Sequence, residues 1–347
     1  MRFSVIPESF IEWLGMVTGQ VPTPLFDTLV GIWQARTVMV AVKLGVFEAL
    51  ATGPRTAAEV AERCQTKPMP TDKLLGALVG ARYLTLRRER YGLTRTARLW
   101  LLAGSISSLR DSMLFRFVEW DLLAHYESYA RTGVCLDVHD NLDKETWPAY
   151  PGGMRAIASL AAPEVVKRTP VPARATRLLD IGGAHGCYAA ALCRRYPALS
   201  GVILDLPDMV AHAAPLLEAE VLGERLRHQV GDVLETDLGE ATFDVVLLAQ
   251  LVHHFDEATN RELQQRIARA LRPGGVVVVQ DMFKAASPRK AGQAGALADY
   301  YFAMVSASGT WRHEDVAAWQ RDAGLAPHKP LNFRSVPGTG QQTASRH

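Results

Sequence analysis

Residues 180–186 join a carboxylate to a glycine-rich turn, a combination that suits ligand binding. They read Asp-Ile-Gly-Gly-Ala-His-Gly, and they close an apolar stretch over 175–181. Residues 187–196 then have the pattern of a helix, which Pro197 ends. Glycines let the backbone turn sharply and let a ligand approach closely. A strand, a glycine turn and a helix in this order predict the first unit of a doubly wound sheet, with its ligand at the carboxyl ends of the strands.

Two further carboxylates follow later strands. A predicted strand over 201–204 ends at Asp205, and Gly231-Asp232-Val233 follows a third strand near 226–230. A carboxylate at the tip of the second strand is placed to accept hydrogen bonds from ribose hydroxyls. We expect Asp232 to accept from an adenine amine, with Val233 packed on the ring.

The pair Asp180 and Asp205 is also compatible with NAD, but the turn argues against that cofactor. Its glycines do not follow the Gly-x-Gly-x-x-Gly pattern of dinucleotide-binding proteins. Asp180 also stands directly before the glycines, where a carboxylate would repel a pyrophosphate and would instead face the cationic end of a ligand.

The elements that position these residues fall into two patterns. From about residue 174, apolar strands alternate with amphipathic helices. They include strands over 243–248 and 276–279, and the second of these follows the run Leu-Arg-Pro-Gly-Gly at 271–275. Residues 106–165 read as longer helices.

Residues 25–105 read as short helices that end in a small hairpin. Helical spacing over 37–50 has a break at Gly45, and a third helix starts near 72. Thr56 and Glu59 form a capping box, the signature of a helix start. Alternation over 83–86 and 90–94 predicts two strands of a wing. Three helices and a wing indicate a winged-helix unit.

In this order, the Asp-Ile-Gly-Gly turn, Asp205, Gly231-Asp232-Val233 and the run at 271–275 resemble the motifs of class I S-adenosylmethionine-dependent methyltransferases. With the winged helix, the chain from about 25 to 335 resembles the caffeate-type and bacterial natural-product O-methyltransferase family. The resemblance implies an α/β fold, with a doubly wound Rossmann-like sheet after a mostly helical dimerisation domain. It implies three parts: a dimerisation domain (1–105), connecting helices that line the substrate pocket (106–170) and an S-adenosylmethionine-binding domain (171–347).

The resemblance also implies the ligands and partners. S-adenosylmethionine is the expected cofactor and S-adenosylhomocysteine its product, with no metal. The acceptor is a hydroxyl of a small aromatic or polyketide-like molecule, and the protein is a homodimer through its N-terminal domain. The cofactor contacts we expect are Asp180, Gly182, Gly183, Gly186, Asp205, Leu206, Asp232, Val233 and Gln250.

Methyl transfer needs alignment of the acceptor with the methyl carbon, and a phenol, whose unperturbed pKa is ~10, must also lose its proton. Histidine is the natural base at neutral pH. In the family the loop after the fourth strand carries such a base, which by position is His253, with His254 beside it as the second candidate. An acidic residue usually orients this histidine, and in this chain Gln280 stands in its slot. Asp281 could substitute, but we expect its side chain on the opposite face of the strand.

A second acidic residue of the family is also missing. The segment where it is expected reads Ser-Gly-Thr-Trp-Arg-His over 308–313, so that Thr310 stands in the acidic slot. The substrate-lining residues we expect are Met154, Trp147, Tyr150, Tyr301 and Trp311.

Composition excludes several other classes. The net charge is +2, with 38 basic and 36 acidic residues, which leaves no electrostatic footprint for nucleic acid or an anionic membrane. We find no apolar run of the ~18 residues that span a bilayer and no signal peptide. The four cysteines lack metal-binding spacing. These features predict a cytoplasmic protein that binds neither nucleic acid nor membrane.

Three alternatives stay open on the sequence. The missing acidic residues leave room for a C-, N- or S-methyltransferase that works mainly by proximity. They also leave room for an S-adenosylmethionine-binding enzyme of another reaction type. A DNA-binding regulator would rest on the winged helix alone, whose third helix carries few basic residues.

Overall fold

The computed structural model describes residues 4–136, 138, 142, 146–306, 308–336 and 338–347. Its contacts divide the chain into two compact units, residues 2–117 and residues 118–347, with helix α8 (Arg110–Leu122) crossing the boundary. The expected three-part division of the chain stays a prediction.

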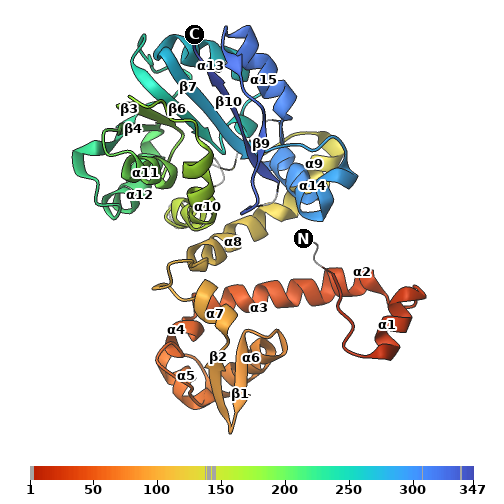
Figure 1. Ribbon diagram of the computed structural model, residues 1–347. Helices are drawn as coiled ribbons and strands as arrows, with labels where there is room; N and C mark the ends of the chain where they lie inside the picture. The colour runs from red at the N-terminus through yellow and green to blue at the C-terminus, as the bar shows by residue number, and fades with distance from the viewer. Residues whose placement is uncertain (1–3, 137, 139–141, 143–145, 307, 337) are drawn as a thin grey trace. The chain divides into compact units, whose positions relative to one another are not determined.

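The N-terminal unit contains several helices, a two-stranded hairpin and a last short helix (Figure 1). Its elements are α1 (Phe10–Val17), α2 (Thr23–Leu25), η1 (Phe26–Val30), α3 (Gly31–Lys43), α4 (Val46–Ala49), α5 (Ala57–Arg63), α6 (Pro68–Gly80), β1 (Leu84–Arg87), β2 (Arg90–Leu93) and α7 (Arg95–Trp100). The order of helices and hairpin is that of the sequence expectation, and the winged-helix interpretation stays a prediction.

Local sequence signals set the boundaries of these helices. The predicted break at Gly45 is confirmed, since this glycine has φ 75° and separates α3 from α4. The capping box is confirmed as well, because the Thr56 side chain accepts from the Glu59 backbone N–H and the Glu59 side chain accepts from the Thr56 backbone N–H.

The segment Thr23–Lys43 is one continuous helical stretch of 21 residues that is mostly exposed (Figure 1). By length and composition it could span a membrane, and it is the only such helix among the described residues. The expectation concerned uninterrupted apolar runs, and it holds for this segment, because Asp27 and Arg36 interrupt its apolar sequence. The helix is longer than the sequence suggested because α2 and η1, over 23–30, continue directly into α3.

The C-terminal unit contains a sheet of eight strands. Their order is β5-β4-β3-β6-β7-β10-β8, and β9 also pairs with β10. The strands are β3 (Arg177–Ile181), β4 (Ser200–Asp205), β5 (Leu226–Val230), β6 (Phe243–Ala249), β7 (Leu271–Met282), β8 (Ala326–Pro327), β9 (Leu331–Asn332) and β10 (Thr339–Ser345). The first five in spatial order are parallel. The predicted doubly wound fold with a helical N-terminal domain is confirmed.

Helices cover both faces of this sheet (Figure 1). One core cluster packs α10 (Ala149–Arg168) and α11 (Cys187–Arg195) against β3, β4 and β6. Another packs α13 (Glu257–Ala270) and α15 (His313–Asp322) against the opposite face. The helices of this unit, after α8, are η2 (Leu123–His125), α9 (Tyr126–Thr132), α10 (Ala149–Arg168), α11 (Cys187–Arg195), α12 (Pro207–Glu218), η4 (Gly223–Arg225), η5 (Val252–His254), α13 (Glu257–Ala270), α14 (Pro288–Val305) and α15 (His313–Asp322).

Four strands differ from the sequence expectation. β7 begins at Leu271 and runs to Met282, well beyond the predicted 276–279. The short strands β8 and β9 were not expected. Nor was β10, which pairs antiparallel with β7. Its sequence, Thr-Gly-Gln-Gln-Thr-Ala-Ser, lacks the apolar residues that mark a buried strand.

Candidate active site

The main expected site residues lie together at the carboxyl ends of the parallel strands. Because β3, β4, β6 and β7 are parallel neighbours, their carboxyl ends lie together. The glycine turn follows β3, Asp205 ends β4, His253 follows β6, and Asp281 lies in the last residues of β7.

The glycines of the turn are required by space and by backbone conformation. Gly182 and Gly186 have φ values of 65° and 66°, in the left-handed region. A Cβ on Gly183 would lie 2.4 Å from Oδ2 of Asp180, and a Cβ on Gly186 would lie 2.6 Å from Cδ1 of Ile203. The turn is therefore packed closely from beneath by Asp180 and Ile203.

Asp180 is a buried carboxylate with an unused acceptor. Only 1% of the surface of Asp180 is exposed, and its Oδ1 has no hydrogen-bond partner among the described residues. Burial raises the pKa of Asp180 well above its ordinary value, and the nearby Asp205 raises it further. An orphaned buried oxygen under a glycine cradle fits a ligand that brings a donor or a positive charge, as S-adenosylmethionine does.

Asp205 is fixed by the backbone on both of its oxygens. Oδ2 accepts from the N–H of Ala184, and Oδ1 accepts from the N–H of Leu206, both at 2.8 Å. These bonds fix the carboxylate at the end of β4, the position from which such a group accepts from ribose hydroxyls. Leu206 is partly exposed directly beside it.

Asp232 and Val233 lie after β5, and both have structural contacts. Oδ1 of Asp232 accepts from the N–H of Leu234 at 2.8 Å. Val233 is buried in the cluster that packs α13 on the sheet. Their expected contacts with an adenine ring stay a prediction.

Gln250 adopts an unusual backbone conformation at the end of β6. Its φ is 55°, and its N–H donates to the carbonyl of Gln280 at 2.8 Å. A non-glycine residue in the left-handed region is strained, and such residues cluster at functional sites. This bend leads the chain from β6 toward η5 and His253.

His253 is buried, with 3% of its surface exposed, and it pairs with Asp281. Its Nδ1 lies 2.8 Å from Oδ1 of Asp281. Because a carboxylate accepts, Nδ1 is assigned as the protonated nitrogen, and Nε2 keeps its lone pair. The ring centroid lies 4.4 Å from that of His254 and 4.4 Å from that of Phe302 on α14.

The expectation that Gln280 occupies the orienting slot is wrong. Its Nε2 donates to the hydroxyl of Tyr188 at 3.2 Å, on the face that packs against α11. Since β7 continues through Met282, its side chains keep alternating, and Asp281 points to the other face, where His253 lies. The inference that the two side chains face opposite ways holds, but Asp281 is the one beside the histidine.

At the second position where the family has an acidic residue, Thr310 contacts a carboxylate from helix α14. The Thr310 hydroxyl donates to the Asp299 carboxylate of α14, and Lys284 forms an ion pair with the same carboxylate at 3.2 Å. The Trp311 indole N–H donates to the carbonyl of Val252 at 3.0 Å, directly before His253. These contacts fix α14 and the 308–313 segment close to the base.

The expected substrate residues separate into two groups. Tyr301 on α14 donates from its hydroxyl to Glu119 at 3.2 Å, and Trp311 packs near the base as above. Trp147 instead stacks on His212 of α12, with centroids 5.7 Å apart, and Tyr150 packs edge-on against it. Met154 lies on α10, partly buried.

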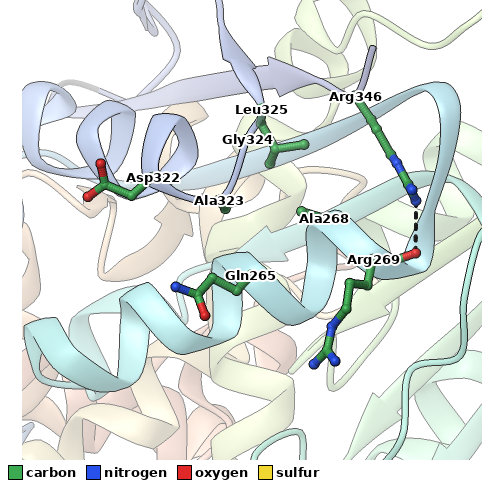
Figure 2. A pocket seen from close by; sticks show the side chains of 8 residues that line it. All are labelled: Gln265, Ala268, Arg269, Asp322, Ala323, Gly324, Leu325 and Arg346. Atoms are coloured by element: carbon green, nitrogen blue, oxygen red, sulfur yellow. Dashed lines mark hydrogen bonds between the residues drawn. The ribbon is translucent and has the colours of Figure 1, made fainter.

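A shallow depression of about 490 Å³ lies elsewhere on this unit, between α13 and the end of α15 (Figure 2). Arg346 crosses it and donates to the carbonyl of Arg269 at 2.9 Å. It lies where β7 begins and β10 ends, whereas His253 follows the carboxyl end of β6. The depression is therefore at the opposite ends of the strands and is not the candidate active site. Among the described residues, no three His, Cys, Asp or Glu side chains are placed to hold a metal ion.

One residue that contacts the backbone of the glycine turn was not predicted from the sequence. His228 on β5 places Nε2 2.7 Å from the carbonyl oxygen of Ala184. An isolated histidine in a strand carries no sequence signal for such a contact.

Comparison with known proteins agrees with this architecture. Residues 126–324 match the model of the O-methyltransferase domain, and residues 26–103 match that of the O-methyltransferase dimerisation domain. The 3-hydroxy-5-methyl-1-naphthoate 3-O-methyltransferase of Streptomyces sahachiroi is 28% identical over 330 residues, which cover 92% of this chain and 94% of that protein. The N,N-dimethyltransferase OxyT of Streptomyces rimosus is 29% identical over 72% of this chain and 75% of its own.

A solved structure shares the fold at low sequence identity. Human N-acetylserotonin methyltransferase in complex with S-adenosylmethionine superposes with a TM-score of 0.80 at 18% identity, and the match covers 99% of both chains. The chain is an S-adenosylmethionine-dependent methyltransferase with a domain that supports homodimerisation, and it belongs to the O-methyltransferase family.

Proposed function

We propose that this protein transfers a methyl group from S-adenosylmethionine to a hydroxyl of a small aromatic or polyketide-like molecule, with His253 as general base. The observation that carries the proposal is the pairing of His253 Nδ1 with Asp281, which leaves Nε2 as the basic nitrogen. The named relative that acts on a hydroxynaphthoate supports a fused aromatic acceptor.

The cofactor would lie on the glycine turn. Asp180 offers its unpartnered oxygen to the charged end, and Asp205, held by Ala184 and Leu206 at the end of β4, is placed to accept from the ribose. When bound, S-adenosylmethionine supplies an electrophilic methyl group on a positively charged sulfur. Asp232, Val233 and Gln250 would complete the contacts at the same edge.

The chain's own part in the reaction is to place the acceptor and to remove its proton. The acceptor hydroxyl would give its proton to Nε2 of His253 while its oxygen takes the methyl group; the bond between methyl carbon and sulfur breaks, and S-adenosylhomocysteine leaves with the electron pair. The imidazolium that results is stabilised by the Asp281 carboxylate at 2.8 Å. His254, whose ring lies against that of His253, is the alternative base.

Aromatic side chains near the base favour a flat acceptor. Phe302 lies against the His253 ring, and Tyr301 and Trp311 lie on the segments beside it. Rings of this kind stack on planar substrates. Trp147, Tyr150 and Met154 would bound the site from the α10 side.

We also propose that exposed apolar residues of the N-terminal unit form the homodimer interface. They cluster between residues 6 and 33 and include Phe10, Trp13, Leu29 and Trp33. A surface of this kind usually marks an interaction site, and the dimerisation match begins within it.

A nitrogen acceptor is the second candidate, because one similar relative is named as an N,N-dimethyltransferase. The purified protein should be incubated with methyl-labelled S-adenosylmethionine and matched panels of phenols and aromatic amines. We expect label in the phenols, with an O–CH3 signal by NMR. Label in the amines alone would replace the first proposal by the second, and an absence of S-adenosylhomocysteine binding in calorimetry would overturn both.

A further inference from the structure

Ala184 is the one residue of the glycine turn that carries a side chain in a left-handed conformation. Its φ is 41°. This conformation is sparsely populated for residues other than glycine, so surrounding contacts must hold it.

Two side chains from neighbouring strands hold the backbone of Ala184 from its two sides. Asp205 at the end of β4 accepts from its N–H at 2.8 Å. His228 on β5 places Nε2 2.7 Å from its carbonyl oxygen. A carbonyl only accepts, so Nε2 of His228 must carry the proton, as it does in one neutral tautomer and in the imidazolium.

The register of the sheet explains why His228 reaches the turn. His228 pairs with Ile203 of β4, and parallel partners point their side chains to the same face. Ile203 packs beneath Gly186 on that face, together with Leu217 of α12. The turn therefore rests on a seat built from Ile203, Leu217 and His228, of which only His228 is a hydrogen-bond donor.

We propose that His228 is a positioning residue for the cofactor: its Nε2–H holds the Ala184 carbonyl and so keeps the glycine turn in its binding conformation before the cofactor arrives. A binding site that is formed in advance loses less free energy to ordering when its ligand binds. The proposal rests on the assignment of this turn to S-adenosylmethionine. It predicts an effect on cofactor affinity and none on the chemical step.

The test compares His228→Gln with His228→Leu in the full-length protein. The Gln amide nitrogen can take the place of Nε2, whereas Leu removes the donor. We expect His228→Leu to raise the Kd for S-adenosylhomocysteine, measured by calorimetry, by about 10-fold, the order of one hydrogen bond. The KM for S-adenosylmethionine should rise with it. kcat at saturating cofactor should stay within about twofold, and His228→Gln should restore most of the affinity.

Gln229→Leu is the matched control, because Gln229 is exposed on the same strand and lies outside the turn's seat. It should leave the Kd unchanged. If His228→Leu does not fold, His228→Asn replaces it, since its shorter amide stays polar but does not reach Ala184.

The possible results separate this inference from the proposed function. No binding by the unchanged protein would refute the assignment of the cofactor turn itself. Normal binding by the unchanged protein, with an equal Kd in the Leu or Asn variant, would overturn the role of His228 alone. An equal loss of affinity in the Gln and Leu variants would overturn it as well, because the donor would then not be what matters.

Discussion

Nδ1 of His253 lies 2.8 Å from Oδ1 of Asp281, although 28 residues separate the two in the chain. The pair joins η5 to the last residues of β7, and both side chains are buried. Asp281 also accepts from the N–H of Met282 at 2.7 Å, which fixes the carboxylate before it contacts the ring. A histidine held in this way keeps one tautomer and presents one nitrogen to the site.

Removal of the base or of its partner should lower turnover by different amounts. We expect His253→Ala to lower kcat by roughly 100-fold or more, as for loss of a general base. Asp281→Asn should lower it by at least about 10-fold, because an amide can also donate and then favours the wrong tautomer. Steady-state kinetics with a phenolic acceptor would measure both.

Asp121→Asn serves as the control for the carboxylate change, because Asp121 is exposed on α8. Its kcat should not differ from that of the unchanged protein. A loss below about threefold in His253→Ala would show that positioning alone drives the reaction.

Asp180→Asn should raise the stability of the ligand-free protein while it weakens cofactor binding. Burial, and then Asp205, raise the pKa of Asp180, so keeping this carboxyl ionised costs folding free energy. That cost appears as the pH rises above the carboxyl's unfolded pKa of about 3.9 and is complete above the folded pKa. Asparagine has no such cost, so its melting temperature should exceed that of the unchanged protein at pH 8 and match it near pH 4.

Thermal unfolding at both pH values, with calorimetry of S-adenosylhomocysteine, tests this trade-off. A gain of 1 kcal/mol corresponds to about 2–4 °C for a unit of this size. A lower melting temperature at pH 8, or unchanged affinity for the ligand, would contradict the assignment of Asp180.

Gly183→Ala should disable the cofactor turn without a change in backbone conformation. The added Cβ would lie 2.4 Å from the Asp180 carboxylate, so Asp180 would have to move. We expect the Kd for S-adenosylhomocysteine to rise by at least about 10-fold.

Gly76→Ala in α6 is the matched control, since nothing lies within 4 Å of its added Cβ. It should stabilise the protein by about 0.5–1 kcal/mol, the usual gain of alanine over glycine in a helix. Equal affinities in both variants would mean that the turn adapts to the extra methyl group.

Glu220→Gln should destabilise the C-terminal unit. Glu220 is only 7% exposed and bridges Arg155 of α10 and Arg194 of α11, each at 2.6 Å. Burial alone would raise the pKa of Glu220, but the hydrogen bonds from the two arginines outweigh it and the pKa is lowered. Because the arginines are partly exposed, we expect a loss of about 1–3 kcal/mol, below that of a fully buried pair.

The contribution of Glu220 to the free energy of unfolding should depend on pH. The stabilisation is complete above the unfolded pKa of about 4.3 and is lost as the pH falls through the folded pKa. Urea unfolding should therefore separate the two proteins at pH 7, and the difference should vanish as the pH falls below the lowered folded pKa of Glu220. Glu127→Gln, which breaks an exposed pair with Arg131, should change stability by less than about 0.5 kcal/mol.

A double charge change, Leu29→Glu with Trp33→Glu, should convert the homodimer to monomers. Both side chains are exposed and lie four residues apart on one helical stretch. Light scattering after size exclusion would measure the mass. Val221→Glu, at an exposed position outside this surface, should leave a dimer, and a dimer in the double variant would place the interface elsewhere.

The sequence by itself determined the features that depend on neighbouring residues. The glycine turn after β3, the alternation of strands and helices, the capping box at Thr56 and the break at Gly45 were all predictable, because each follows from backbone conformation within a few positions. The same local signals carried the resemblance to the methyltransferase motifs.

The tertiary structure decided which distant side chains meet. Asp281 rather than Gln280 faces His253, because β7 extends to Met282 and its pleat places alternate residues on opposite faces. The contact of His228 with Ala184 depends on the register of β5 against β4. The contact of Glu220 with two arginines depends on how α10 and α11 pack beside the turn that follows α12. Register and packing are fixed by the balance of many contacts along the chain, so no short sequence pattern specifies them.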